Sequence, residues 1–167
     1  MKKLLLSIVL AMFCSLAGAQ MAKFQALYLF NFAKNTSWPT EDAGKPFVIT
    51  VIGDNAVSSE LKGIVSNKQV GDRKIQVVEA ATASGIAKSD IIYLGESKSG
   101  QISSLVQAQA GNKCLIVSGT KGQCSQGAGI AFVPEGGKLN FEIHEGNIQK
   151  SGLKVTPKLV QLGKAVY

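Results

Sequence analysis

The sequence has little of the residue types that support catalysis or nucleic-acid recognition. Its 167 residues include one arginine, Arg73, and one histidine, His144. Proteins that read nucleic-acid sequence rely on arginine to grip guanine edges and phosphates, so a positive charge carried almost wholly by lysine argues against that class. The sequence also has no phosphate loop, no dinucleotide fingerprint and no His/Asp/Glu metal cluster. We therefore predict no cofactor, no metal and no nucleic-acid partner.

Cysteine is scarce as well, with three residues, of which Cys14 lies in an apolar N-terminal run. The other two, Cys114 and Cys124, have nine residues between them, which does not suit the paired ligands of a zinc site. An even pair in an oxidising compartment is most simply one disulfide. Two buried free thiols are the alternative.

Long hydrophobic runs are absent except at the start of the chain. Lys2 and Lys3 precede an apolar run, Leu4–Leu16, and the small residues Ala17–Ala19 follow it. This order is typical of a secretory signal peptide cleaved after Ala19, and the run is shorter than the roughly 20 residues of a membrane span. An uncleaved anchor is the alternative. We predict a signal peptide over 1–19, export to the periplasm without stable membrane insertion, and one domain over 20–167.

The segment that follows the predicted signal is unusually apolar. Residues 22–34 contain strong helix formers and neither glycine nor proline, and Pro39 ends the element. Apolar side chains fall on two faces of this helix, so it is either fully buried or shared with a partner. One face can cover a sheet, and the helix supplies our candidate dimer or partner surface, which consists of Phe24, Leu27, Tyr28, Leu29 and Phe30.

The remainder of the chain alternates between β-branched runs and helical segments. Strands are predicted at 47–52, 74–78, 90–94 and 114–117, and a hairpin at 129–133 and 138–143 around Pro134–Gly137. Helices are predicted at 57–66, 99–110 and after Thr156-Pro157, with Leu159, Leu162 and Val166 inward, and 80–89 is a weaker helical segment. This pattern predicts a single α/β domain of a three-layer kind, with helices flanking a mixed sheet that is parallel at its centre and has an antiparallel C-terminal hairpin.

Ligands of open α/β sheets gather beyond the carboxyl ends of the strands. The residues there are small or polar, and the candidate ligand pocket consists of Gly53, Asp54, Gly95, Ser97 and Ser118. Ordinary turn and helix-cap chemistry accounts for the same residue types.

One arrangement suggests an enzyme. Gly95-Glu96-Ser97 follows a strand and precedes a helix, as in a hydrolase nucleophile elbow, but Ser99 stands where that pattern needs glycine. The base would have to be His144, just past a strand. A helix-capping serine and a surface histidine explain both residues more simply, so we predict no catalytic residues and no enzymatic activity.

Short motifs along the chain resemble those of the YfiR-like family of small exported proteins. They occur in the same order, at Ala26–Lys34 with Trp38-Pro39, Val51–Gly53, Gly71–Ile75, Asp90–Gly95, Gly127–Phe132, Leu139–Ile143, Ser151–Val155 and Lys158-Leu159. The resemblance implies a periplasmic α/β protein without known catalysis. It also implies the role of the namesake, which represses an inner-membrane diguanylate cyclase, lowers cyclic di-GMP and restrains biofilm formation.

The resemblance further implies a dimer and a disulfide near the later strands, where Cys114 and Cys124 fall. The chain departs from the family in having His144 where asparagine is frequent, and in lacking a second cysteine pair. We predict an exported, non-enzymatic regulatory protein that binds and restrains a membrane signalling protein, either a diguanylate cyclase or a sensor kinase. The alternative is a periplasmic protein that binds a small molecule at the strand ends.

Overall fold

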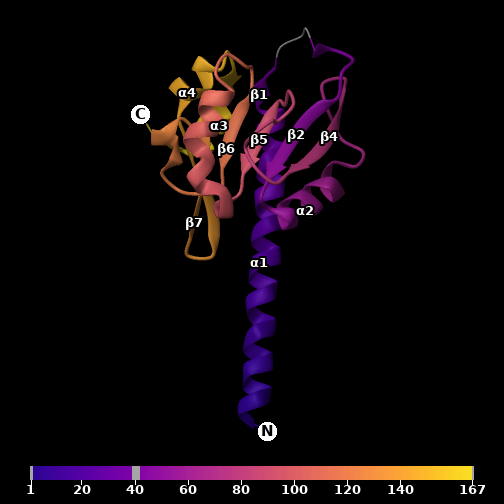
Figure 1. The fold of residues 1–167 in the computed structure, drawn as a ribbon, viewed down its shortest axis with the longest axis vertical. Coiled ribbons are helices and arrows are strands. Elements are labelled where there is room, and N and C mark those ends of the chain that lie inside the picture. Colours follow the sequence, from indigo (N-terminus) through magenta and orange to yellow (C-terminus); the bar gives the residue numbers. More distant parts are fainter. Residues whose placement is uncertain (1, 39–41, 167) are drawn as a thin grey trace.

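The computed structural model describes residues 2–38 and 42–166, and gives side-chain surroundings within the first helix from residue 18 onward. That helix, α1, runs from Lys2 to Lys34 and includes residues 2–19 of the predicted signal peptide as well as the predicted helix 22–34. Its N-terminal part projects from the domain, and its C-terminal part lies against the sheet (Figure 1). Within the described residues, none of the helices has both the length and the apolarity of a membrane span.

The centre of the fold is a mixed sheet. Among the described residues, eight strands pair in the order β10-β8-β7-β6-β5-β2-β4-β3. Strands β4, β2, β5, β6 and β7 are parallel, whereas β8 is antiparallel to β7, as predicted for the C-terminal hairpin. The bounds are β2 Phe47–Ile52, β3 Gln69–Val70, β4 Arg73–Ala80, β5 Ile91–Leu94, β6 Leu115–Ser118, β7 Ile130–Glu135, β8 Lys138–Ile143 and β10 Lys164–Ala165.

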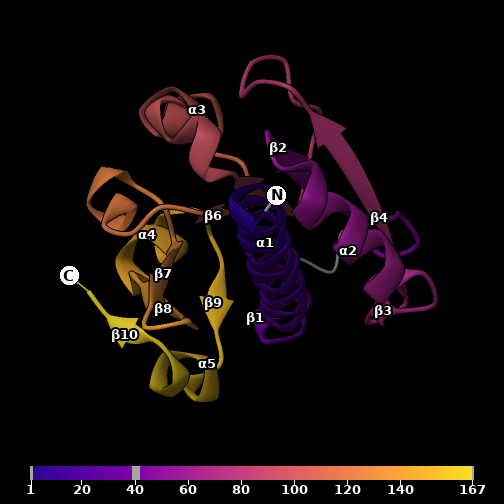
Figure 2. The ribbon, with the colours of Figure 1, turned by 90° about the horizontal axis from the view of Figure 1, so that it is seen from below.

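Helices cover both faces of this sheet, which confirms the predicted layered α/β architecture (Figure 2). On one face, α1 and α2 (Asn55–Val65) pack over the larger hydrophobic cluster. On the other face, α3 (Ile102–Ala108), which directly follows the 3₁₀ helix η2 (Glu96–Gln101), covers the smaller cluster around Ile92 and Ile116. The core is divided into two clusters because successive side chains along a strand point to opposite faces of the sheet.

Short elements complete the large-cluster side. Helices α4 (Glu145–Lys150) and α5 (Pro157–Leu162) bury Ile148 and Leu159 there. Between them, β9 (Lys154–Val155) pairs with β1 (Thr36–Ser37), directly after α1. The loop before β7 contains a short 3₁₀ helix, η3 (Gln123–Gln126).

Two local predictions are wrong. The segment after β4 is not helical. Gly85 takes a left-handed φ of 68°, and Ala83 and Ile86 instead pack on the smaller cluster. The last helix, predicted to place Leu162 and Val166 inward, ends at Leu162, because the chain leaves α5 at Gly163 and enters β10. Leu162 is 66% exposed, and Val166 lies half-buried beyond β10 and not in a helix.

Candidate functional site

The buried face of α1 is built from small and aromatic side chains. Ala22, Ala26, Leu29 and Ala33 follow the three- and four-residue spacing of one helix face, and all are buried. The alanines let the helix approach the sheet closely. Phe32 lies beside them, with its ring centroid 5.1 Å from that of Phe141. One face of the predicted helix therefore covers the sheet.

The other face of α1 leaves two large apolar side chains in solvent. Phe24 is 38% exposed and Leu27 is 37% exposed, one helical turn apart. Tyr28 and Phe30 are partly buried against the core. Leu29 belongs to the core and not to the predicted surface, because it lies on the alanine face. The candidate partner surface is thus reduced to Phe24 and Leu27, flanked by Tyr28 and Phe30.

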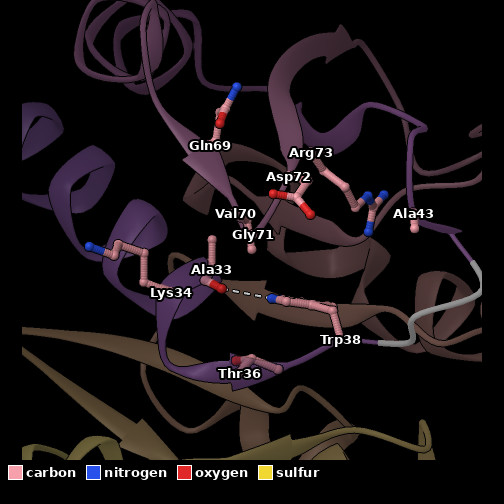
Figure 3. A pocket seen from close by; sticks show the side chains of 10 residues that line it. All are labelled: Ala33, Lys34, Thr36, Trp38, Ala43, Gln69, Val70, Gly71, Asp72 and Arg73. Carbon is pink, nitrogen blue, oxygen red and sulfur yellow. Dashed lines mark hydrogen bonds between the residues drawn. The ribbon is translucent and has the colours of Figure 1, made fainter.

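A cavity of about 390 Å³ opens where α1 ends. Figure 3 shows Trp38 on one side of it and Asp72 and Arg73 on the opposite side. The indole Nε1 of Trp38 donates to the carbonyl oxygen of Ala33 over 2.7 Å, and its ring packs edge-on against Phe47. Sequence reasoning missed this cavity, although the Gly71-Asp72 turn and the lone tryptophan mark its two walls.

The single arginine is buried at the edge of this cavity and has a structural role. The guanidinium of Arg73 donates to both carboxylate oxygens of Asp90, over 2.8 and 2.7 Å. It also donates to the carbonyl oxygens of Lys45 and Pro46, and it lies 5.0 Å from the centre of the Phe47 ring. These contacts join the beginnings of β2, β4 and β5, which explains why an arginine stands in the Gly71–Ile75 segment.

A second carboxylate organises the loop before β2. Asp42 is buried, and it accepts hydrogen bonds from the ammonium groups of Lys88 (2.9 Å) and Lys45 (3.1 Å). These two partners, Lys88 most strongly, lower the pKa of Asp42 from its ordinary 3.8 to about 2. Asp42 therefore stays ionised across the physiological range.

The residues of the predicted strand-end pocket do come to one edge of the sheet, after the neighbouring strands β2, β5 and β6. Their polar groups are used locally. Asp54 caps α2 by accepting from the backbone N–H of Val57, Ser97 donates to the carbonyl of Gly53, and Ser118 contacts Gln123. A Cβ on Gly95 would lie 2.9 Å from the carbonyl oxygen of Ile52, so the backbones are in close contact there.

One of these five residues, Gly53, lines a cavity. That cavity measures about 330 Å³, and Lys98 and Glu79 also contribute to its walls. At the same edge, the hydroxyl of Thr120 is buried and has no hydrogen-bond partner within the described part of the chain.

The topology separates the serine and histidine considered for hydrolysis. Ser97 follows the carboxyl end of β5, whereas His144 follows β8, which runs in the opposite direction and ends at the other end of the sheet. His144 is the N-cap of α4, where its Nδ1 accepts from the backbone N–H of Asn147 over 3.1 Å. The two residues therefore form no catalytic pair.

Cys114 and Cys124 are both buried in the structure and are not bonded to each other, and the disulfide between them stays a prediction. Cys114 directly precedes β6 and belongs to the smaller cluster, whereas Cys124 lies in η3 with its Sγ 3.9 Å from the carbonyl oxygen of Gly129. Burial raises the pKa of each thiol to about 12, with smaller contributions from Asp90 and Glu142 respectively. No group of three or more His, Cys, Asp or Glu side chains in the described residues could hold a metal ion.

Fold and surface together define a small mixed α/β protein whose polar side chains serve the fold and whose first helix exposes apolar groups. The chain belongs to the YfiR/HmsC-like family, whose sequence profile matches residues 22–164. This family consists of periplasmic, non-catalytic regulators of cyclic di-GMP signalling. A search of curated proteins finds no match to the chain.

Proposed function

We propose that this chain is an exported, non-enzymatic protein that binds and restrains the periplasmic part of an inner-membrane diguanylate cyclase or sensor kinase. Family membership over residues 22–164 supports the regulatory role. The observation that carries the binding role is the pair Phe24 and Leu27, which expose apolar surface from a helix otherwise anchored in the core. Apolar groups presented together on a rigid element are suited to a protein partner.

The export step is part of this proposal. Cleavage after Ala19 would remove the N-terminal part of α1 and keep Met21 and Ala22, which pack on the hydrophobic core. The mass of the chain recovered from the periplasm should correspond to residues 20–167. Recovery of the uncleaved chain in the membrane fraction would contradict export by this route.

The regulatory role is tested by deleting the gene and measuring cellular cyclic di-GMP. We expect a rise, and complementation with the unaltered chain should reverse it. Complementation with Phe24→Asp/Leu27→Asp should fail, although the domain still folds, because both side chains are already exposed. Leu162→Asp is the matched control, since it places the same charge on another exposed leucine. An unchanged cyclic di-GMP level in the deletion strain would contradict the proposal.

Small-molecule binding at the strand ends is the second candidate. The cavity beside Gly53 and the unpaired Thr120 hydroxyl favour it. A ligand present at 100 times its Kd would stabilise the fold by about 2.7 kcal/mol and raise the melting temperature. A thermal-shift screen of metabolites measures this, and flat melting curves would argue against the candidate.

A further inference from the structure

The cavity where α1 ends lies at the opposite end of the sheet from the strand-end residues. Arg73 on its wall begins β4, whereas Gly53 and Gly95 follow the carboxyl ends of β2 and β5, and these three strands are parallel. Its volume of about 390 Å³ falls within the roughly 300–1,000 Å³ that is typical of small-molecule sites. The cavity is therefore a separate candidate site with its own ligand chemistry.

The indole ring of Trp38 forms one wall of this cavity and has no free donor. Its Nε1 already donates to the carbonyl oxygen of Ala33 over 2.7 Å. A T-shaped contact with Phe47, with the ring centroids 4.8 Å apart, holds the indole in place. In Figure 3 one face of the indole is turned toward the side on which Asp72 lies. What the ring offers to a ligand is therefore its π face, which attracts positive charge.

The opposite wall carries the carboxylate of Asp72, in the two-residue turn between β3 and β4. Val70 pairs with Arg73 across that turn, and Gly71 takes a left-handed φ of 57°, so the chain reverses tightly and holds Asp72 at the cavity. Figure 3 shows the carboxylate pointing into the cavity. In the described part of the chain it has no hydrogen-bond or ion-pair partner. Its negative charge is therefore available to a ligand.

The two cationic side chains that line the cavity, Lys34 and Arg73, do not neutralise Asp72. The guanidinium of Arg73 donates to both carboxylate oxygens of Asp90 and to two backbone carbonyls. The ammonium of Lys34 lies 5.7 Å from the centre of the Phe30 ring, and Figure 3 shows it pointing away from the indole. The charge that faces the indole across the cavity is therefore that of Asp72.

We propose that this cavity binds a small organic cation, namely an amine attached to an apolar body. The ammonium group donates a charge-assisted hydrogen bond to Asp72 and interacts with the π face of Trp38. The apolar body packs on Ala33, Ala43 and Val70, which line the same cavity. An anion is repelled by Asp72, and a neutral molecule gains neither polar interaction. The inference depends neither on the proposed regulatory function nor on the strand-end pocket.

Tryptophan fluorescence of the purified protein is the first test. Trp38 is the one tryptophan of the chain, so its emission reports on this cavity. Phenethylamine is the cationic probe, and 2-phenylethanol is its uncharged analogue with the same apolar body. We expect phenethylamine to change the emission saturably and to bind about tenfold or more tightly than 2-phenylethanol, because the alcohol brings no charge to the carboxylate or the ring.

Asp72→Asn tests the carboxylate. The variant should fold normally, since asparagine suits a turn. We expect it to weaken phenethylamine binding about tenfold and to leave 2-phenylethanol binding unchanged, because only the amine uses the negative charge. Glu135→Gln is the matched control, since it removes one carboxylate from an exposed position in the β7–β8 hairpin, and it should alter neither affinity.

Trp38→Leu and Trp38→Phe test the aromatic wall. Isothermal titration calorimetry is the measurement, because neither variant retains the fluorophore. Both variants replace the indole with an apolar group, but only phenylalanine keeps a π face. Phenethylamine should therefore bind several-fold more weakly to Trp38→Leu than to Trp38→Phe.

Three outcomes overturn the inference. The first is a titration in which phenethylamine changes neither the emission nor the heat. The second is equal affinity for phenethylamine and 2-phenylethanol, which would make the cavity an apolar site without preference for a cation. The third is phenethylamine binding that Asp72→Asn leaves unchanged, which would place the cation elsewhere on the protein.

Discussion

The two halves of the sheet are held together by different forces. Around β2, β4 and β5 lie four ion pairs, which include the buried Arg73–Asp90 pair. Around β7 and β8, aromatic rings dominate, with Tyr28 and Phe32 of α1 packed on Phe132 and Phe141. Helix α1 lies across both halves, where it packs on α2 beside the first half and on the Phe132 and Phe141 rings of the second.

This difference means that the halves should respond to different perturbations. Ion pairs depend on protonation and on the presence of both partners, whereas aromatic packing depends on volume and is indifferent to pH. The following predictions test that division in order of decreasing effect.

Phe132→Ala should destabilise the protein most on the aromatic side, by about 3–5 kcal/mol, because it removes a fully buried ring and leaves a cavity. Urea unfolding at pH 7 and pH 5 measures the loss, which should be the same at both values. A loss that changes with pH would show that the aromatic half is coupled to a titrating group.

Arg73→Met should also cost about 3–5 kcal/mol, because it leaves the Asp90 carboxylate buried without its partner. Replacing both residues by Arg73→Met/Asp90→Leu should recover part of that loss, since no uncompensated charge then remains. Chemical unfolding of the parent protein, the single variant and the double variant measures these changes in stability. Equal stability of the single and double variants would mean that the isolated carboxylate costs little.

Asp42→Asn should have a smaller effect that depends on pH. The pKa of Asp42 lies below its ordinary value, so its ionised form favours the fold, and this contribution is present above about pH 4 and is lost as pH falls toward 2. The stability difference between the variant and the parent protein should therefore shrink between pH 4 and pH 2. A constant difference over that range would contradict the role of Lys88 and Lys45.

We expect the thiols of Cys114 and Cys124 to contribute little to stability. Their reactivity should be low in the native protein and high in the unfolded protein. Because burial raises the pKa of both Cys114 and Cys124 to about 12, neither forms a thiolate at pH 8 in the native state. A colourimetric thiol reagent should react with two groups only after denaturant is added. If denatured protein reacts only after reduction, the two residues form a disulfide.

Much of the fold could be predicted from local patterns. The β-branched runs at 47–52 and 114–117 become β2 and β6 almost residue for residue, because a central parallel strand needs a continuous apolar segment. The two-residue strands β3, β9 and β10 could not be predicted, since they exist only where a distant strand offers hydrogen bonds. The 80–89 segment was misread because its small residues suit a helix locally but are needed to cover the smaller cluster.

The candidate sites were predictable in place but not in role. Gly53, Gly95 and Ser118 do come to one sheet edge. At that edge, however, the side chains of Ser97 and Asp54 form hydrogen bonds with neighbouring backbone groups. His144 illustrates the same limit. Its position after β8 was foreseen, but its role as a helix cap depends on α4, a helix of six residues without a clear sequence signal.

The sequence by itself determined the alternation of strands and helices, the burial of the central strands and the apolar character of the first helix. Those properties are local, because they follow from side-chain type and spacing. Only the tertiary structure decided that Leu29 is buried while Phe24 and Leu27 are exposed, and that Trp38 and Asp72 line one cavity. These outcomes depend on partners far apart in sequence, such as Tyr28 and Leu139, which are 111 residues apart, so no local pattern could specify them.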